Sequence, residues 1–236
     1  MARRPLNHEK HRPARSTAHA LPQPIRRAVI QGQRGRGSPG KRRTAFLPPE
    51  NWYEPQYSGR GYRIVVEKPG AGYRHVLTPE LVRQRLRRLP PTLLESLEVV
   101  QLSRMTRKKE SFPCYGMQWG QAIYLYPIEE SLVEQFHRPP RPSEFNDARM
   151  YGGRWVQQSG SSWQLVWTME AIRDFYLNNV LIHELGHLVD QRNTSHRDRE
   201  RFAEWFAIEM GYKRSQRLSE IGEEPKLPAL RRHGRK

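Results

Sequence analysis

Apolar residues alternate or recur at helical spacing from about residue 51 onward, and this pattern predicts short strands mixed with helices. Thr78-Pro79-Glu80 has the form of a helix start, and apolar residues continue at helical spacing until Pro90. The alternating segment 122–126 ends at Pro127 and is the clearest strand of the core sheet. The other elements expected in this half are strands at 62–67 and 97–102 and helices at 92–96 and 128–137.

The second half of the pattern predicts a hairpin that leads into two long helices. Residues 153–157 and 163–167 flank a polar turn and form the hairpin. Thr168 caps a helix that runs to about Val189 or Gln191, and a second helix covers about 196–211, with Thr194 or Ser195 as its cap. The predicted fold class is α+β, with a small mixed or antiparallel sheet packed on the first long helix.

Positive charge is concentrated at the two ends of the chain. Residues 1–50 hold twelve Lys or Arg against two Glu, a charge of +10, and residues 213–236 hold eight against three, a charge of +5. Of the total of +17, residues 51–212 carry only +2. The N-terminal stretch is rich in Gly and Pro and has no apolar period, so it cannot offset its chain entropy by burial. We expect a disordered basic tail at 1–50, one domain at 51–212 and a basic tail at 213–236.

Composition also bears on location and partners. The single cysteine, Cys114, excludes an intramolecular disulfide and fits a reducing compartment. The chain has neither an apolar run of about 18 residues nor an ordinary secretory signal. We therefore expect no membrane span and a cytoplasmic location, with non-classical export left open. The basic tails are either solubilising segments or a handle for nucleic acid or another polyanion.

His183-Glu184-Leu185-Gly186-His187 lies within the first long helix. Residues four apart in a helix are about 40° apart round the axis and about 6 Å apart along it, so His183 and His187 can bind one cation. Glu184 can reach a water on that cation and act as general base. Gly186 costs on the order of 1 kcal/mol relative to alanine, which indicates a close packing contact at its backbone. The pattern predicts one zinc ion per chain.

A catalytic zinc site needs a third protein ligand, and the second long helix offers two candidates. Glu200 and Glu204 are four residues apart and share one helix face, so geometry alone allows either to bind. The glutamate that does not bind is placed to hydrogen-bond a ligating histidine. The metzincin class would need a histidine six residues after His187, and Asn193 excludes it.

The segments HELGHLVD at 183–190 and ERFAEWF at 200–206 resemble the motifs of glutamate-zincin metallopeptidases of the anthrax lethal factor and Pro-Pro endopeptidase type. The resemblance implies a zincin-like fold, Glu200 as the third ligand and Glu204 as a support of the site, and we place Asp190 with Glu204 in that supporting role. Aminopeptidase-like zincins use a Glu-x-Phe-Ala motif that Glu204 also fits, so Glu204 stays the alternative ligand.

The chain departs from this family in two respects. The two motifs lie closer together than in the toxins and endopeptidases, and the family's tyrosine seven residues before the ligand glutamate is Asn193 here. Stabilisation of an oxyanion is therefore unassigned by the resemblance, and His196 and Tyr212 are the candidates.

The function expected from these motifs is that of a zinc-dependent endopeptidase that acts on a peptide or protein. Trp155, Trp163 and Trp167 are candidates for lining the substrate cleft, and either the hairpin or the strand at 123–126 for pairing with the substrate backbone. The alternative is a nucleic-acid-associated regulatory protein that keeps a zincin scaffold and acts through its basic tails. A vestigial, non-catalytic module is the third possibility, and the intact Glu184 argues against it.

Overall fold

The computed structural model describes residues 49–50, 52–54, 61–111 and 114–220. Apart from Pro49 and Glu50, the predicted N-terminal tail lies outside the described residues. Of the predicted C-terminal tail, residues 213–220 are described, and they form helix α7 (Lys213–Glu220). Within these ranges, no helix combines the length and the apolar character that a membrane crossing needs.

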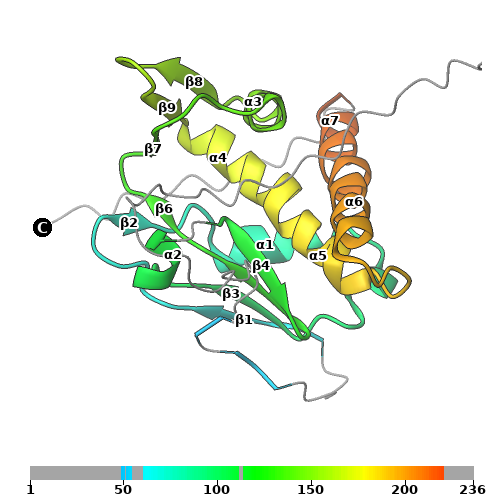
Figure 1. The fold of residues 1–236 in the computed structure, drawn as a ribbon. Helices are drawn as coiled ribbons and strands as arrows, with labels where there is room; N and C mark the ends of the chain where they lie inside the picture. The colour runs from blue at the N-terminus through cyan, green and yellow to red at the C-terminus, as the bar shows by residue number, and fades with distance from the viewer. Residues whose placement is uncertain (1–48, 51, 55–60, 112–113, 221–236) are drawn as a thin grey trace, which may run out of the picture.

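The main sheet has four strands in the order β1-β3-β5-β4 (Figure 1). Its strands are β1 (Arg63–Val66), β3 (Val99–Leu102), β4 (Gly116–Trp119) and β5 (Ala122–Leu125). β1, β3 and β5 are parallel, and β4 runs antiparallel to β5 at the edge. The three strands predicted for this region are confirmed. Because β5 is paired on both sides, the expectation that the strand at 123–126 accepts a substrate backbone is wrong, and the edges of the sheet are β1 and β4.

Helix α1 (Pro79–Leu86) begins as its sequence predicts. The Thr78 side chain accepts a hydrogen bond from the Leu81 backbone N–H at 3.4 Å, and proline occupies the first helical position. Val82 and Leu86 are fully buried against the main core. The short helix that follows is the 3₁₀ turn η1 (Pro91–Leu94), and a further short helix, α2 (Arg107–Ser111), lies between β3 and β4.

The helix predicted at 128–137 is wrong. This segment forms the strands β6 (Ile128–Glu129) and β7 (Val133–Phe136), joined by a turn in which Leu132 has a φ of 59°. The apolar positions of this segment fit both the helical and the strand period. Strand pairing decides between the two, because β6 pairs with β2 (Tyr73–Arg74) and β7 pairs with a later strand.

The predicted hairpin is confirmed as β8 (Arg154–Gln157) and β9 (Trp163–Val166), and β7 joins it to give the order β7-β9-β8. Helix α3 (Pro142–Met150) lies between β7 and this hairpin in the chain. Trp167 is 5 % exposed and stacks on Phe175, so the expectation that it lines a cleft is wrong. Trp155, which packs against Phe136, and Trp163 are half-buried, and for these two residues the cleft stays a prediction.

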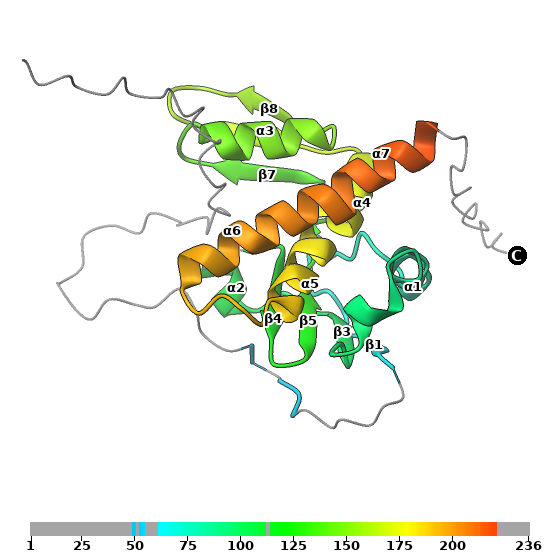
Figure 2. The same ribbon diagram turned by 90° about the vertical axis from the view of Figure 1, so that its right-hand side faces the viewer.

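Two long helices complete the molecule (Figure 2). The first comprises α4 (Met169–Phe175), the π-helical segment η2 (Tyr176–Val180) and α5 (Leu181–Val189). The second comprises α6 (His196–Phe206), the π-helical segment η3 (Ala207–Tyr212) and α7. Caps at Thr168 and Ser195 are confirmed by their hydrogen bonds to Ala171 N and Asp198 N.

The first long helix lies across one face of the main sheet, and the core fills the space between them (Figure 1). Val100, Ile123 and Leu125 of the sheet and Leu181 and Leu185 of α5 are almost fully buried there. The architecture is thus mixed, with small sheets and several helices, and it is compatible with the predicted α+β class. It carries the predicted metal motif on a buried helix that crosses the sheet.

Candidate metal centre

Two histidines and one glutamate from the two long helices meet at one point. The Nε2 atoms of His183 and His187, both on α5, lie 3.1 Å apart. On α6, Glu200 places Oε1 3.3 Å from His187 Nε2 and Oε2 3.7 Å from His183 Nε2. Because their ligand atoms all lie within 4.8 Å of one another, these three residues could hold a metal ion.

The turn between α5 and α6 is short and held by polar contacts. The Asp190 carboxylate accepts hydrogen bonds from the backbone N–H groups of Arg192 and Asn193 at 3.3 and 3.2 Å, and from Asn193 Nδ2. Ser195 then caps α6 by accepting from Asp198 N at 3.1 Å. These bonds give Asp190 a role in directing α6 back toward the histidines, and its predicted contact with a ligating histidine stays a prediction.

Gly186 allows the two helices to approach closely, as the sequence predicts. A Cβ at this position would lie 2.9 Å from the Ala203 Cα and 3.3 Å from the Cβ atoms of Ala203 and Phe206. Arg199, which sequence reasoning missed, also joins the helices, because its guanidinium donates to the His187 carbonyl at 3.1 Å. Nothing in the local pattern around Arg199 distinguishes it from its charged neighbours.

Burial and charge set the protonation of the glutamate in this group. His183 is 3 % exposed, and the Glu200 side chain is 23 % exposed. Burial alone would raise the pKa of Glu200, but hydrogen bonds and positive charge from His183 and His187 outweigh it and hold this pKa well below its usual range. Glu200 is therefore a carboxylate at neutral pH, which is the form that binds cations.

Glu184 lies between α5 and the edge strand β4. Its side chain is buried, at 3 % exposure, and faces Gly116. A Cβ at Gly116 would come within 3.1 Å of Glu184 Cγ, 3.2 Å of Glu184 Oε1 and 2.8 Å of a methyl of Val180. A glycine at the start of β4 thus leaves the space that the Glu184 carboxyl occupies.

The sequence prediction missed β4, although a signal for it was present. Met117 and Trp119 alternate with Gly116 and Gln118, and the two-residue turn that begins at Gly120 leads directly into β5. Gly120 has a φ of 58°, which short hairpin turns require. A hairpin assignment for 116–125 would have identified the edge strand beside Glu184.

Two other predicted site residues, Glu204 and His196, lie near the metal-binding group but are not part of it. Glu204 lies one turn beyond Glu200 on α6, is half-buried, and is not among the described side chains that make up the metal-binding group. His196 Nε2 lies 3.8 Å from Glu200 Oε1 with its side chain 59 % exposed, so His196 borders the group.

Tyr212 is not brought to the metal-binding group. It lies twelve residues after Glu200, which is about 18 Å along a helix that rises about 1.5 Å per residue. Its ring packs edge-on against Tyr151, with the centroids 5.4 Å apart. The expectation that Tyr212 stabilises an oxyanion is therefore wrong, because the second helix continues past the site instead of folding back over it.

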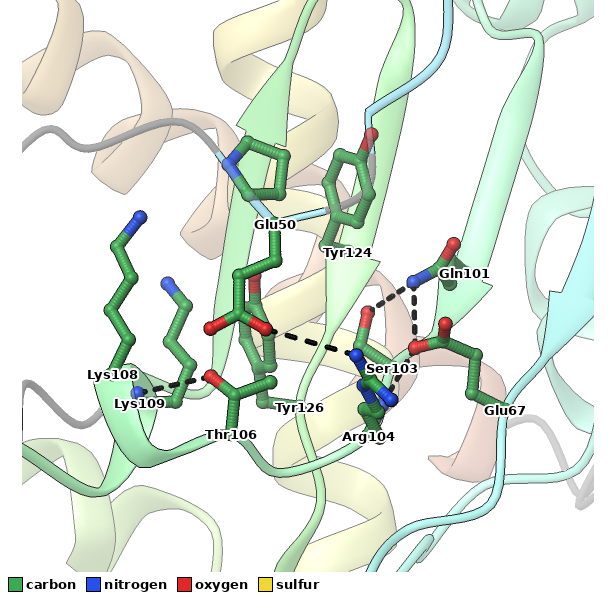
Figure 3. A pocket seen from close by; sticks show the side chains of 11 residues that line it. Glu50, Glu67, Gln101, Ser103, Arg104, Thr106, Lys108, Lys109, Tyr124 and Tyr126 are labelled. Carbon is green, nitrogen blue, oxygen red and sulfur yellow. Dashed lines mark hydrogen bonds and ion pairs between the residues drawn. The ribbon is translucent and has the colours of Figure 1, made fainter.

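A small hollow lies on the face of the main sheet opposite α5 (Figure 3). Its volume is about 20 Å³, which suits water and not a peptide side chain. Its polar groups bind one another: Gln101 Nε2 donates to Glu67 Oε2 at 3.0 Å and to Ser103 Oγ at 3.1 Å, and Arg104 N donates to Glu67 Oε2 at 3.0 Å. The buried Tyr124 hydroxyl, which also lines this hollow, has no hydrogen-bond partner among the described residues, but the hollow is too small for a peptide, so the metal-binding group remains the candidate site.

The donor set of that group, two imidazoles and one carboxylate, leaves room in a four-coordinate site for one further ligand. Glu184 follows His183 on α5, and its carboxyl lies against Gly116 of β4. In comparisons with models of protein families, with curated proteins and with solved structures, nothing matches this chain.

Proposed function

We propose that the protein is a zinc-dependent endopeptidase of the glutamate-zincin kind, with His183, His187 and Glu200 as zinc ligands. The observation that carries the proposal is the spacing of the three ligand atoms. Zinc bound tetrahedrally at about 2.0 to 2.1 Å keeps its ligand atoms about 3.3 Å apart. His187 Nε2 lies 3.1 Å from His183 Nε2 and 3.3 Å from Glu200 Oε1, which is close to this value, and the other carboxylate oxygen, Oε2, lies 3.7 Å from His183 Nε2. The ligand types also suit zinc, which accepts both imidazole and carboxylate.

The reaction is hydrolysis of a peptide bond, in which a water oxygen bonds to the carbonyl carbon and the carbon–nitrogen bond breaks. A bound zinc ion supplies Lewis acidity, which makes water a nucleophile near neutral pH and polarises the carbonyl. The Glu184 carboxylate accepts the proton that the attacking water loses and delivers it to the nitrogen of the leaving amine. His196, at the border of the group, is the candidate for a hydrogen bond to the developing oxyanion.

The edge strand β4 supports a peptide as the substrate. In the described part of the chain, β4 pairs only with β5, so its outer backbone groups can pair with an extended segment. Because Gly116 of β4 lies against the Glu184 carboxyl, a peptide added at this edge would pass beside the proposed general base. A glycine there also keeps side-chain bulk away from the path of the substrate.

The test separates metal binding from catalysis. Purified protein should contain about one zinc per chain by elemental analysis and should cleave members of a library of unstructured peptides. His183→Ala should lose the zinc, whereas His137→Ala, a change at an exposed histidine outside the site, should keep it. Glu184→Gln should keep the zinc and lower kcat/KM by at least about 100-fold, the usual contribution of a general base.

The matched control for Glu184 is Glu170→Gln, which changes an exposed glutamate on the same long helix. This variant should keep both zinc and activity. Protein that binds no zinc would overturn the proposal, and so would full peptidase activity in Glu184→Gln.

A further inference from the structure

Each of the two facing helices carries a pair of ligand-type residues four positions apart. On α5 the pair is His183 and His187. On α6 the pair is His196 and Glu200. Residues at this spacing share a helix face and can present their ligand atoms to one ion. Three of these four residues form the metal-binding group, and the fourth is His196, the first residue of α6.

The Glu200 carboxylate faces imidazoles from both helices. Its Oε1 atom lies 3.3 Å from His187 Nε2 and 3.8 Å from His196 Nε2. The second distance is about 0.5 Å longer than the separation of ligand atoms around a tetrahedral zinc ion. His196 is also not among the residues whose ligand atoms all lie within 4.8 Å of one another. Its imidazole must therefore turn inward to reach an ion held by the other three residues.

The His196 side chain can make this turn, because it is mobile on a fixed piece of backbone. The side chain is 59 % exposed, and exposed side chains exchange rotamers within picoseconds to nanoseconds. Its backbone is held by the Ser195 cap, which accepts from Asp198 N at 3.1 Å, and by the turn that the Asp190 carboxylate organises. A movable imidazole beside a bound carboxylate is what a reversible metal ligand requires.

Two other carboxylates near the start of α6 are engaged in local contacts. Asp198 accepts a hydrogen bond from Ser195 Oγ at 2.6 Å, and its other oxygen lies 3.9 Å from Arg201. Asp190 accepts hydrogen bonds from the turn between α5 and α6. His196, in contrast, presents its ligand atom to the carboxylate of the metal-binding group. It is therefore our candidate for a fourth ligand.

We propose that His196 is a reversible fourth zinc ligand, which closes the metal site of the resting protein and is displaced when a substrate binds. The proposal rests on the zinc ligands of the proposed function and adds regulation of that site. In the closed state, three imidazoles and one carboxylate fill a tetrahedral coordination sphere and leave no position for a catalytic water. When His196 turns outward, water or a substrate carbonyl takes the fourth position. The freed imidazole stays beside the site, where it can donate a hydrogen bond to an oxyanion.

X-ray absorption spectroscopy of the zinc-loaded, full-length chain tests the closed state directly, because it counts the imidazoles bound to the metal. Wild type should show three imidazoles and His196→Ala should show two. The matched control is Arg197→Ala, a change at the next exposed residue of α6, and it should show three. Two imidazoles in wild type would overturn the proposal. The wild-type measurement is decisive even if His196→Ala does not fold.

Two affinities should change in opposite directions in His196→Ala. Zinc affinity, measured in competition with a chelator, should fall at least about 10-fold, although a residue that only orients Glu200 would cause a similar loss. Azide binding to the cobalt-substituted protein, followed by visible absorption, should become at least about 10-fold tighter. This gain is expected if the closed state holds at least about nine-tenths of the wild-type molecules, because azide then competes with His196. Unchanged or weaker azide binding would contradict the proposal.

The variant His196→Cys keeps a zinc ligand at this position, since thiolate also binds zinc. It should therefore retain most of the zinc affinity that His196→Ala loses. Equal zinc affinities in the two variants would contradict a direct bond to the metal.

The outcomes separate this proposal from the peptidase proposal. Two imidazoles in a protein that cleaves peptides would overturn the fourth ligand and leave the peptidase standing. Three imidazoles in a protein that cleaves no peptide would support the fourth ligand and overturn the peptidase. A chain that binds no zinc would overturn both.

Discussion

The two long helices approach each other closely at two glycines, and the two contacts do different work. At one, Gly186 lies against Ala203, and at the other, Gly211 lies against Asn178. The contacts are eight residues apart on each helix, as expected for an antiparallel pair in one register. Close approach at Gly186 brings side chains from both helices to one ion-sized space. Close approach at Gly211 occurs where both helices are π-helical, and the group that faces this glycine is a backbone carbonyl.

The surroundings of the two contacts explain this difference. Beside Gly186, the polar groups are the two histidines and Glu200, which meet each other in a cation-binding arrangement. Beside Gly211, Arg85 and Tyr151 satisfy the carbonyls of Met210 and Asn178 from outside the helix pair. π-Helical turns displace backbone carbonyls from the regular helical pattern, which lets side chains from other elements reach them. The same kind of close packing therefore supports the candidate metal-binding group at one end and a structural network at the other.

The largest effect is expected from Gly211→Ala. The added Cβ would overlap the Asn178 carbonyl, which is backbone and cannot change rotamer. We expect the free energy of unfolding to fall by about 3 kcal/mol or more, measured by urea denaturation. Because the obstacle is backbone, no substitution of the Asn178 side chain should restore stability. A change below about 1 kcal/mol would show that the two helices can separate here at little cost.

A buried carboxylate near η2, the π-helical segment of the Gly211 contact, predicts a pH effect of similar size. Glu134 accepts hydrogen bonds from Tyr115 and Trp167, and Tyr115 packs against Tyr176 of η2 and precedes Gly116 in the chain. Burial raises the pKa of Glu134 to about 7, above its unfolded value of 4.5. Between these two values the folded state holds a proton that the unfolded state has lost, so stability falls as pH rises.

The contribution of Glu134 to the free energy of unfolding should therefore decline by about 3 kcal/mol between pH 4.5 and 7 and stay constant above that range. Other carboxyls titrate with either sign, so the measured quantity is the stability difference between wild type and Glu134→Gln, by urea denaturation at each pH. Wild type should lose stability relative to the variant as pH rises. Parallel curves for the two proteins would contradict the assignment.

The smallest change in stability is expected from Gly186→Ala. Overpacking against Ala203 costs about 1 to 3 kcal/mol, and the better helix propensity of alanine returns about 1 kcal/mol. The main effect should be on the metal, because a wider helix spacing moves Glu200 away from the histidines. We expect at least a 10-fold lower zinc affinity in competition with a chelator.

The double variant Gly186→Ala with Ala203→Gly should recover part of this zinc affinity, because one obstacle at this contact is a side-chain Cβ, 3.3 Å from the position of the new one. Rescue at this contact and its absence at Gly211 would sharpen the difference between them. Unchanged zinc affinity in the single variant would indicate that Gly186 does not set the ligand spacing.

Local pattern was sufficient wherever a property depends on neighbours in the chain. The caps at Thr78, Thr168 and Ser195, the hairpin before the motif helix and the shared helix face of His183 and His187 all follow from residues within a few positions of each other. For the same reason Gly186 could be assigned to a close contact, since a costly residue in a helix needs a local explanation. What packs against it could not be assigned.

The pattern of apolar residues gave wrong predictions where the helical and strand periods fit equally well, or where the interacting residues are distant in the chain. The segment 128–137 was predicted as a helix because its apolar spacing suits one, but pairing with β2 and β9 makes it two strands. The Trp167 indole was considered for a cleft, yet its N–H group binds the buried Glu134. In both cases the outcome depends on residues 27 or more positions away.

The sequence by itself determined the chemistry that this protein can offer: two histidines and a neighbouring glutamate on one buried helix, with two further glutamates on the next. Only the tertiary structure decided that Glu200 meets the histidines and that Gly116 of an edge strand lies against Glu184. The physical reason is that side-chain direction along a helix follows from its period, whereas the meeting of two helices depends on close packing at a few positions such as Gly186 and Gly211.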